Sequence, residues 1–363
     1  MPSPSSPTLT MSLFPEEQLD SPLGYFPAQP GQTFKEGGWT IVRKLGWGPR
    51  SSTWLAVDNK EGVDRYGAIK ILTAAATEDS TGKIERDILL GPVKNIQNGV
   101  PELLTNFYEH DTKGKRHLCL VFRVLGHSVE ELRLSNIYDG EYLPLHIVQK
   151  VVGDISERLA QLADQRFVHG AVTADNFLFW SVQAAVDIRK MLAKSPSNKA
   201  EKILGSDGVT YPVVKSQPIP NGFRWDSPEE DIMRAVIYLS NYAHARPIGG
   251  AGTLESPKNF LPPEALQGGR VDHKSDIWML GCTTYLLLTG NVLFSDSYIG
   301  SPTKTAAEVL GKLETLLTES EKLAENDISS AALFLRSCLA IKPTNRASAE
   351  DILRGGWIKT GYS

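Results

Sequence analysis

The sequence predicts an α+β protein in which a small β-rich lobe precedes a larger helical lobe. Strand-like runs separated by glycines and charged turns occupy residues 38–125. From residue 126 onward, apolar residues recur at helical spacing in several segments. The chain has 363 residues, 41% hydrophobic and 22% charged, which is enough for two folded domains.

The first 37 residues have a different composition from the rest of the chain. They contain seven prolines and three Ser-Pro pairs, and they carry no regular apolar pattern. Such a composition cannot bury enough apolar surface to order a chain. We therefore expect residues 1–37 to form a disordered tail.

The elements of the small lobe follow from short β-branched and aromatic runs. One segment between these runs, Gly82–Leu90, has helical character. The lobe is therefore expected to be a small sheet with one helix. The predicted strands are Trp39–Leu45, Ser52–Asp58, Tyr66–Leu72 and His117–Leu125.

The large lobe, expected over residues 126–360, begins with the strongest helical signal. Leu145–Gln165 places its apolar residues three and four apart, which indicates a core-facing helix. An insertion at about 181–235 is predicted to hold a hairpin and loop between Ser195 and Asp231. Further helices are predicted at Ser275–Leu288, Lys304–Thr318, Ser329–Ala340 and Ser348–Arg354.

One segment, Ile277–Ser295, is free of charge and nearly long enough to span a membrane. It contains three threonines, an asparagine and two glycines, which favour a helix buried in a protein core. We expect no membrane partner.

Charge and cysteine content restrict the classes of partner and compartment. The 38 basic and 42 acidic residues give a net charge of −4, which argues against a protein built to coat nucleic acid. Three widely spaced cysteines form neither a disulfide framework nor a zinc motif. The N-terminus lacks the apolar core of a signal peptide. We expect an intracellular protein, cytoplasmic or nuclear, with a protein partner or protein substrate.

The most specific motif is a glycine pair between two predicted strands. The segment LGWGPRSSTWLAV spans Leu45–Val57, and the strand ending in AIK closes at Lys70, 22 residues after Gly48. Without side chains, Gly46 and Gly48 allow backbone N–H groups to approach phosphate oxygens.

With this motif the chain resembles the protein kinases, and more narrowly the SR-protein kinases and their fungal relatives. The resemblance runs from about residue 24 to 357. It includes four further motifs: RKLGWG at Arg43–Gly48, VFRVLG at Val121–Gly126, PPE at Pro262–Glu264 and SDIWMLG at Ser275–Gly281. It implies a bilobal kinase fold, in which the SDIWMLG helix anchors the catalytic loop and Arg346 pairs with Glu264.

The resemblance also implies a nucleotide site, with ATP as the candidate cofactor. Lys70 matches the lysine that reaches the phosphates, with Glu85 as its helical partner. Val124 and Leu125 match the hinge on which adenine rests. The remaining positions implied in the site are Leu45, Gly46, Gly48, Thr53 and Ala68.

The catalytic loop HGAVTADNFLF, His169–Phe179, departs from the family pattern at a critical position. Ala171 occupies the position of the catalytic aspartate, and Thr173 that of the loop lysine, whereas Asn176 is retained. Alanine has no lone pair to accept a proton and no charge to orient an attacking hydroxyl.

The magnesium position departs as well. In the strand VIYLSNYA, Val236–Ala243, Tyr238 stands where the magnesium-binding aspartate belongs. A phenol is a poor ligand for a hard cation that prefers carboxylate oxygens. Only Asn176 remains as a candidate magnesium ligand, so the sequence argues against magnesium binding. Two displaced carboxylates could substitute: Asp175 for the catalytic base and Asp187 for the magnesium-binding aspartate.

Three hypotheses follow. The first is a pseudokinase, in which the kinase fold acts as a regulatory or binding module with or without ATP. The second is an active Ser/Thr protein kinase that uses displaced carboxylates. The third is a scaffold that binds no nucleotide.

Overall fold

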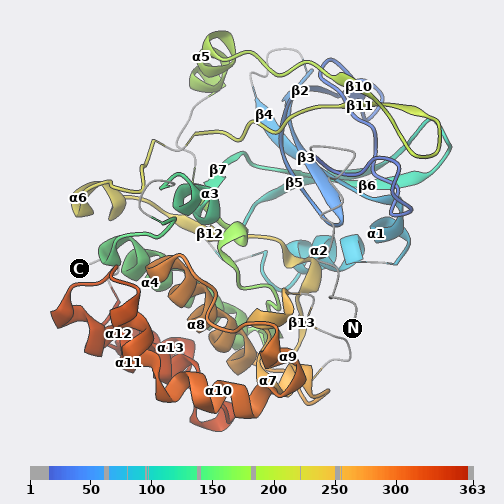
Figure 1. Ribbon diagram of the computed structural model, residues 1–363. Helices are drawn as coiled ribbons and strands as arrows, with labels where there is room; N and C mark the ends of the chain where they lie inside the picture. Colours follow the sequence, from blue (N-terminus) through green and yellow to red (C-terminus); the bar gives the residue numbers. More distant parts are fainter. Residues whose placement is uncertain are drawn as a thin grey trace, which may run out of the picture. The chain divides into compact units, whose positions relative to one another are not determined.

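The computed structural model describes residues 16–358 except for 61–64, 80, 95, 97, 137–139, 181–184, 221, 250–253 and 255. The described residues divide into two units. Unit 1 draws on Met1–Gly82, Leu104–Val124 and Gln183–Pro218, and unit 2 on Lys83–Leu103, Leu125–Val182 and Ile219–Ser363. Unit 1 is mainly β and unit 2 mainly helical, which confirms the predicted α+β class (Figure 1).

Unit 1 is built on a six-stranded sheet in the order β1-β2-β3-β4-β6-β5. Three of its strands coincide closely with predicted ones, whereas β5 was not predicted. Side chains along β5 are half-buried or exposed throughout, so they give no two-residue alternation. The strands are β1 (Thr33–Phe34), β2 (Trp39–Gly48), β3 (Ser51–Asp58), β4 (Tyr66–Leu72), β5 (Leu103–His110) and β6 (Arg116–Phe122), and helix α1 (Ala74–Glu78) follows β4.

The segment before this sheet is ordered from residue 16, so the predicted disordered tail over 1–37 is wrong for residues 16–37. Phe26 and Phe34 lie in the sheet's hydrophobic core. Leu19 and Tyr25 are buried in a second cluster with Tyr211 and Val213. The proline-rich composition gave no regular apolar pattern from which to predict this order. These apolar residues become buried only by packing against the sheet and the insertion. Residues 1–15 lie outside the described part of the chain.

Residues 183–218 of the predicted insertion belong to unit 1, whereas the rest of it belongs to unit 2. The insertion contains helix α5 (Ala185–Lys194) and a hairpin of β10 (Glu201–Leu204) and β11 (Thr210–Val213), as predicted for this region. The Gln217 amide donates to the Lys44 carbonyl at 2.8 Å, and the Ser197 hydroxyl donates to the Val42 carbonyl. These bonds cover the edge of β2 that the two-residue β1 leaves open.

Unit 2 has two small sheets and most of the helices. The order in its three-stranded sheet is β12-β9-β7, and β13 pairs with β8. The elements are α2 (Thr81–Leu90, which begins at the boundary of the units), β7 (Leu125–Ser128), α3 (Val129–Leu134), α4 (Leu145–Asp164), β8 (Phe167–Val168), β9 (Phe177–Trp180), α6 (Glu229–Ile232), β12 (Ile237–Leu239), β13 (Arg246–Pro247), α7 (Pro263–Leu266), α8 (His273–Thr289), α9 (Ser297–Gly300), α10 (Pro302–Gly311), α11 (Leu313–Glu319), α12 (Glu325–Cys338) and α13 (Ala349–Arg354).

Most predicted helices of this unit are confirmed, but the single helix expected over Lys304–Thr318 is wrong. The chain forms α10 and α11 instead, separated at Lys312, whose ψ of 11° departs from helical geometry. The apolar pattern continues across this break, so periodicity alone does not reveal it.

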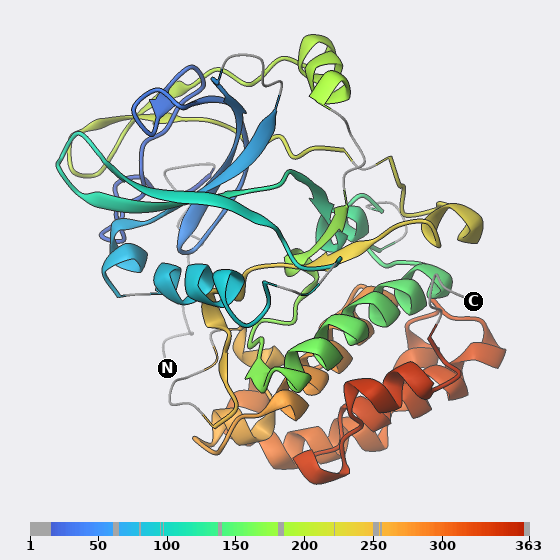
Figure 2. The ribbon, with the colours of Figure 1, turned by 180° about the vertical axis from the view of Figure 1, so that it is seen from behind.

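Helix α8 is the centre of unit 2. Helices α4 and α12 pack against it, and α13 packs against α4 (Figures 1 and 2). Almost every α8 side chain is buried, as predicted for the uncharged segment that begins at Ile277. No helix in the described residues combines the length and the apolar character needed to cross a membrane.

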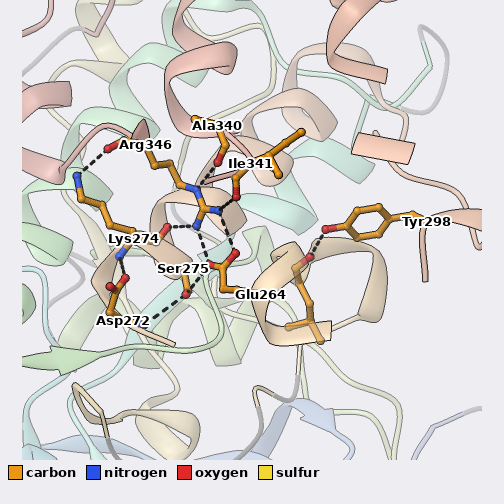
Figure 3. Close-up of polar contacts among 9 residues, drawn as sticks. Glu264, Asp272, Lys274, Ser275, Tyr298, Ala340, Ile341 and Arg346 are labelled. Atoms are coloured by element: carbon orange, nitrogen blue, oxygen red, sulfur yellow. Dashed lines mark hydrogen bonds and ion pairs between the residues drawn. The ribbon is translucent and has the colours of Figure 1, made fainter. Parts of the chain in front are cut away.

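A buried ion pair joins the start of α7 to the segment before α13. Arg346 Nη1 lies 2.8 Å from Glu264 Oε1, and Nη2 lies 3.1 Å from Oε2 (Figure 3). The guanidinium also donates to the backbone carbonyls of Lys274, Ala340 and Ile341. The expected Glu264–Arg346 pair is therefore confirmed.

Replacing Arg346 with leucine should lower the free energy of unfolding by about 3–5 kcal/mol, because it leaves the Glu264 carboxylate without its charge partner. Urea unfolding followed by circular dichroism would measure this loss. Arg354→Ala is the matched control, since its ion pair with Asp351 is exposed and should contribute nothing measurable. Equal stabilities of the two variants would contradict the prediction.

Candidate functional site

The predicted phosphate-binding residues of unit 1 lie in one row across its sheet. Gly46 of β2 pairs with Thr53 of β3, and Thr53 pairs with Lys70 of β4. Leu45 precedes Gly46 on β2, and Ala68 lies two residues before Lys70 on β4. The sheet register therefore brings these five residues together.

The glycine positions have room around them. Among the described residues beyond the immediate chain neighbours, a Cβ atom added at Gly46 or Gly48 would meet no atom within 4 Å. Neither residue adopts the left-handed backbone region that would by itself favour glycine. No described protein neighbour therefore requires glycine here, and the open space fits the approach of a ligand to the backbone.

The remaining nucleotide-site predictions involve both units. Val124 ends a segment of unit 1, and Leu125 begins β7 of unit 2, where it pairs with Trp180. Glu85 is buried on α2 and belongs to unit 2, whereas Lys70 belongs to unit 1. The Lys70–Glu85 pair and the adenine site at the hinge therefore stay predictions.

The catalytic loop of unit 2 is held by a buried carboxylate on α8. Asp276 accepts hydrogen bonds from the backbone amides of His169, at 2.7 Å, and Gly170, at 2.9 Å. Burial raises the pKa of Asp276 to about 7, although both amides act in the opposite direction. The predicted anchoring of the loop by this helix is confirmed.

Gly170 meets a backbone requirement at this anchor. Its φ is +80°, and a Cβ there would lie 2.9 Å from the His244 carbonyl oxygen. Any larger residue would be strained and would collide with the neighbouring backbone.

His169 is a buried neutral residue of the loop. Its Nε2 lies 3.0 Å from the Ser240 carbonyl, to which it donates, while Nδ1 accepts from the Ala171 amide at 3.3 Å. Burial lowers the pKa of this imidazole to about 3. The ring therefore positions the loop backbone and takes no part in proton transfer at neutral pH.

Ala171 and Asn176 face each other within the loop. Asn176 Nδ2 donates to the Ala171 carbonyl at 2.9 Å and to Thr173 Oγ1 at 3.1 Å. Asn176 Oδ1 accepts from the side-chain amide of Asn241 at 3.1 Å. The only retained candidate magnesium ligand thus makes hydrogen bonds with both ends of its side chain.

Tyr238 lies on β12, opposite Leu178 of β9. Its ring is buried and stacks on Trp180, with centroids 5.3 Å apart and planes 16° from parallel. Directly after this strand, Ser240 donates from its amide and its hydroxyl to the Asn176 carbonyl, each at 2.9 Å. An aromatic stack therefore occupies the position where the resemblance places a magnesium-binding carboxylate.

The two displaced carboxylates lie in different settings. Asp175 is exposed beside Asn176 in the loop. Asp187 lies on helix α5 and belongs to unit 1. Its carboxylate is exposed and lies 4.0 Å from Lys190.

Sequence reasoning missed the role of Asn241. Its φ is +66°, a left-handed conformation in which asparagine is enriched. The Ser-Asn pair directly after a short apolar run was the available signal, because asparagine at such a position favours a turn.

Comparison with known proteins agrees with this geometry. Residues 238–358 match the protein kinase domain family. The crystal structure of a kinase domain superimposes with a TM-score of 0.61, covering 92% of this chain and 99% of that one at 19% identity. The chain therefore has a protein kinase fold.

The relatives that this chain resembles in sequence are protein kinases by name. The serine/threonine-protein kinase SRPK of Physarum polycephalum is 26% identical over 82% of this chain and 73% of that protein. Protein kinase dsk1 of Schizosaccharomyces pombe is 22% identical over 86% of this chain and 72% of its own length. SRSF protein kinase 3 of Mus musculus is 29% identical, but the match covers only 43% of this chain and 27% of the relative. Within the kinase fold, the chain resembles the SR-protein kinases.

Asp276 and His169 make opposite contributions to the pH dependence of stability. Near pH 5, folding protonates Asp276, whose pKa rises from 3.8 to about 7, and deprotonates His169, whose pKa falls from 6.5 to about 3. The two effects nearly cancel. In Asp276→Asn the His169 contribution remains alone. Stability should therefore rise with pH between about 4 and 6. The slope of the unfolding free energy against pH should exceed that of the wild type by the equivalent of about one bound proton.

Urea unfolding of both proteins at half-unit pH intervals would measure this difference in slope. The matched variant His169→Gln should show the opposite change, with stability falling as pH rises through the same interval. Parallel pH profiles for all three proteins would contradict the assignment.

Proposed function

We propose that this protein is a pseudokinase: a kinase-fold module that binds ATP without depending on magnesium and acts by binding a protein partner. The observation that carries the proposal is the composition of the catalytic loop and the following strand. Ala171 and Tyr238 replace the two acidic positions, and Asn176 is engaged by Asn241.

The first support is the loss of the group that orients the attacking hydroxyl. General-base positioning contributes about 10² to 10⁴ in rate. The methyl group of Ala171 is buried and provides none of it. Asp175, the nearest substitute along the chain, lies within the loop but four residues after the aspartate position.

The second support is the donor set at the magnesium position, which does not fit the ion. Magnesium requires hard oxygen ligands and is usually held by carboxylates. Here a buried phenol stacks on an indole, and the neighbouring amide oxygen already accepts a hydrogen bond. No step of the proposed function uses magnesium.

The residues proposed to bind ATP fit their ligand better than the donor set described above fits magnesium. Gly46 and Gly48 leave open space along their backbone, and Lys70 lies in the same row of the sheet. Their amides and the ammonium group would bind phosphate oxygens. ATP bound in this way would act as a structural or signalling ligand.

The partner is proposed to be a protein in the cytoplasm or nucleus. The near balance of charges gives no basis for a nucleic-acid partner. An active Ser/Thr kinase and a scaffold without nucleotide are the alternatives, and one titration distinguishes all three.

ATP titrated calorimetrically into the purified chain should bind equally well with and without magnesium. Lys70→Ala should weaken this binding at least tenfold, because it removes the ammonium group proposed to bind the phosphates. The control Lys304→Ala removes an exposed lysine and should bind like the wild type. Binding that requires magnesium would favour the active kinase, and no binding in either condition would favour the scaffold.

Restoring the two acidic positions should create activity if the rest of the site is competent. The double variant Ala171→Asp, Tyr238→Asp should raise magnesium-dependent phosphoryl transfer to a test peptide by about 10²-fold or more over the wild type. The control Ala171→Asn, Tyr238→Asn has similar shape without the charges. Equal rates of both double variants would locate the deficiency elsewhere, in the glycine loop or hinge.

A further inference from the structure

The segment before the sheet contacts the glycine loop directly. The Tyr25 hydroxyl donates to the Gly48 carbonyl at 2.8 Å, across 23 residues of sequence. Burial raises the pKa of this phenol to about 12, so it remains a hydrogen-bond donor throughout the physiological range. Nothing in the established resemblance assigns a role to this residue.

The loop is fastened on its other side as well. Arg50 forms an ion pair with Asp79, and the Arg50 carbonyl accepts from the Thr73 amide at 2.9 Å. The two residues flanking Pro49 are therefore both held, one by Tyr25 and one by the chain around α1. A loop with two glycines would otherwise sample many backbone conformations.

Tyr25 is itself held in a fixed position. The carbonyls of Leu23 and Gly24 accept hydrogen bonds from the Ala75 and Ala74 amides at the start of α1, at 3.1 and 2.9 Å. The Tyr25 ring packs in the buried cluster that includes Leu19. Contacts that do not involve the glycine loop therefore fix the position of the Tyr25 side chain.

A buried lysine joins this segment to the insertion. Lys44 has an exposed side-chain fraction of 1%, forms ion pairs with Glu16 and Glu17, and donates to the Val214 carbonyl at 3.0 Å. Glu16 in turn accepts from the Ser216 amide at 2.9 Å and from its hydroxyl at 2.7 Å. Lys44 precedes Leu45 on β2, so this anchor lies on the strand that leads into the glycine loop.

We infer that residues 16–28 form an internal brace that pre-orders the glycine loop, with Tyr25 as a positioning residue for the phosphate-binding backbone. The brace acts through main-chain geometry, because the Tyr25 hydroxyl donates to the Gly48 carbonyl and so occupies no backbone amide. Ordering a loop before binding reduces the entropy that binding must overcome. The consequence for affinity rests on the proposed binding of ATP, whereas the order of the loop does not.

Hydrogen exchange of residues 46–51 in the nucleotide-free protein tests the brace itself. Tyr25→Phe keeps the buried ring and removes only the hydroxyl, so it should speed exchange in the loop by about three- to tenfold, corresponding to one hydrogen bond. Its midpoint of urea unfolding should fall only slightly, because global unfolding loses the same single hydrogen bond. Tyr108→Phe, which removes a hydroxyl from a more exposed ring on β5, is the matched control and should leave loop exchange unchanged.

Glu16→Gln acts at the far end of the brace and should also speed loop exchange, by a smaller factor. Unchanged loop exchange in Tyr25→Phe would overturn the proposal whether or not ATP binds. Faster exchange in Tyr25→Phe but not in Glu16→Gln would overturn the part played by the Lys44 anchor.

ATP calorimetry on the same variants tests the consequence for the site. Tyr25→Phe should weaken ATP binding by about three- to tenfold, while Tyr108→Phe should bind like the wild type. Faster loop exchange with unchanged ATP affinity would overturn the role in nucleotide binding. A wild-type protein that binds no ATP would refute the proposed function, and loop exchange would still decide whether Tyr25 orders the loop.

Discussion

The geometry of the catalytic loop depends on one buried carboxylate, Asp276. It binds two consecutive backbone amides, so it fixes the loop through its main chain and not through the side chain at position 171. His169 then joins the same loop to the backbone of Ser240. An alanine at position 171, where the resemblance places an aspartate, therefore leaves these anchoring bonds intact. The backbone amides of the loop hold its fold, whereas phosphoryl transfer would depend on a side chain, so a substitution can change one without the other.

Local composition and periodicity made much of the fold predictable. Helix α4 follows from its apolar spacing, the strands β2 to β4 from their β-branched and aromatic composition, and most of α8 from a long uncharged apolar run. Elements that depend on a distant partner were not predictable. The segment around Phe26 gains its burial only against the sheet, and residues 183–218 of the insertion become part of unit 1 only through bonds such as Gln217 to Lys44.

The candidate site was predicted from a resemblance, which gives residue types but no contacts. Resemblance located Ala171, Asn176 and Tyr238, because each stands in a recognisable motif. It could not indicate that Asn241 donates to Asn176, or that Tyr238 stacks on Trp180. Those contacts depend on a left-handed backbone and on strand pairing, which no local pattern of residue types specifies.

The assembly of unit 1 from separate stretches of chain has a consequence for synthesis on the ribosome. The strands of its sheet have all been made by residue 124, but the segment covering β2 ends at residue 218. At 5–20 residues per second, the nascent sheet waits roughly 5 to 20 s with this edge open. An open strand edge is a template for pairing with other chains. The nascent protein should therefore need a chaperone most during this interval, and fragments that stop near residue 125 should aggregate.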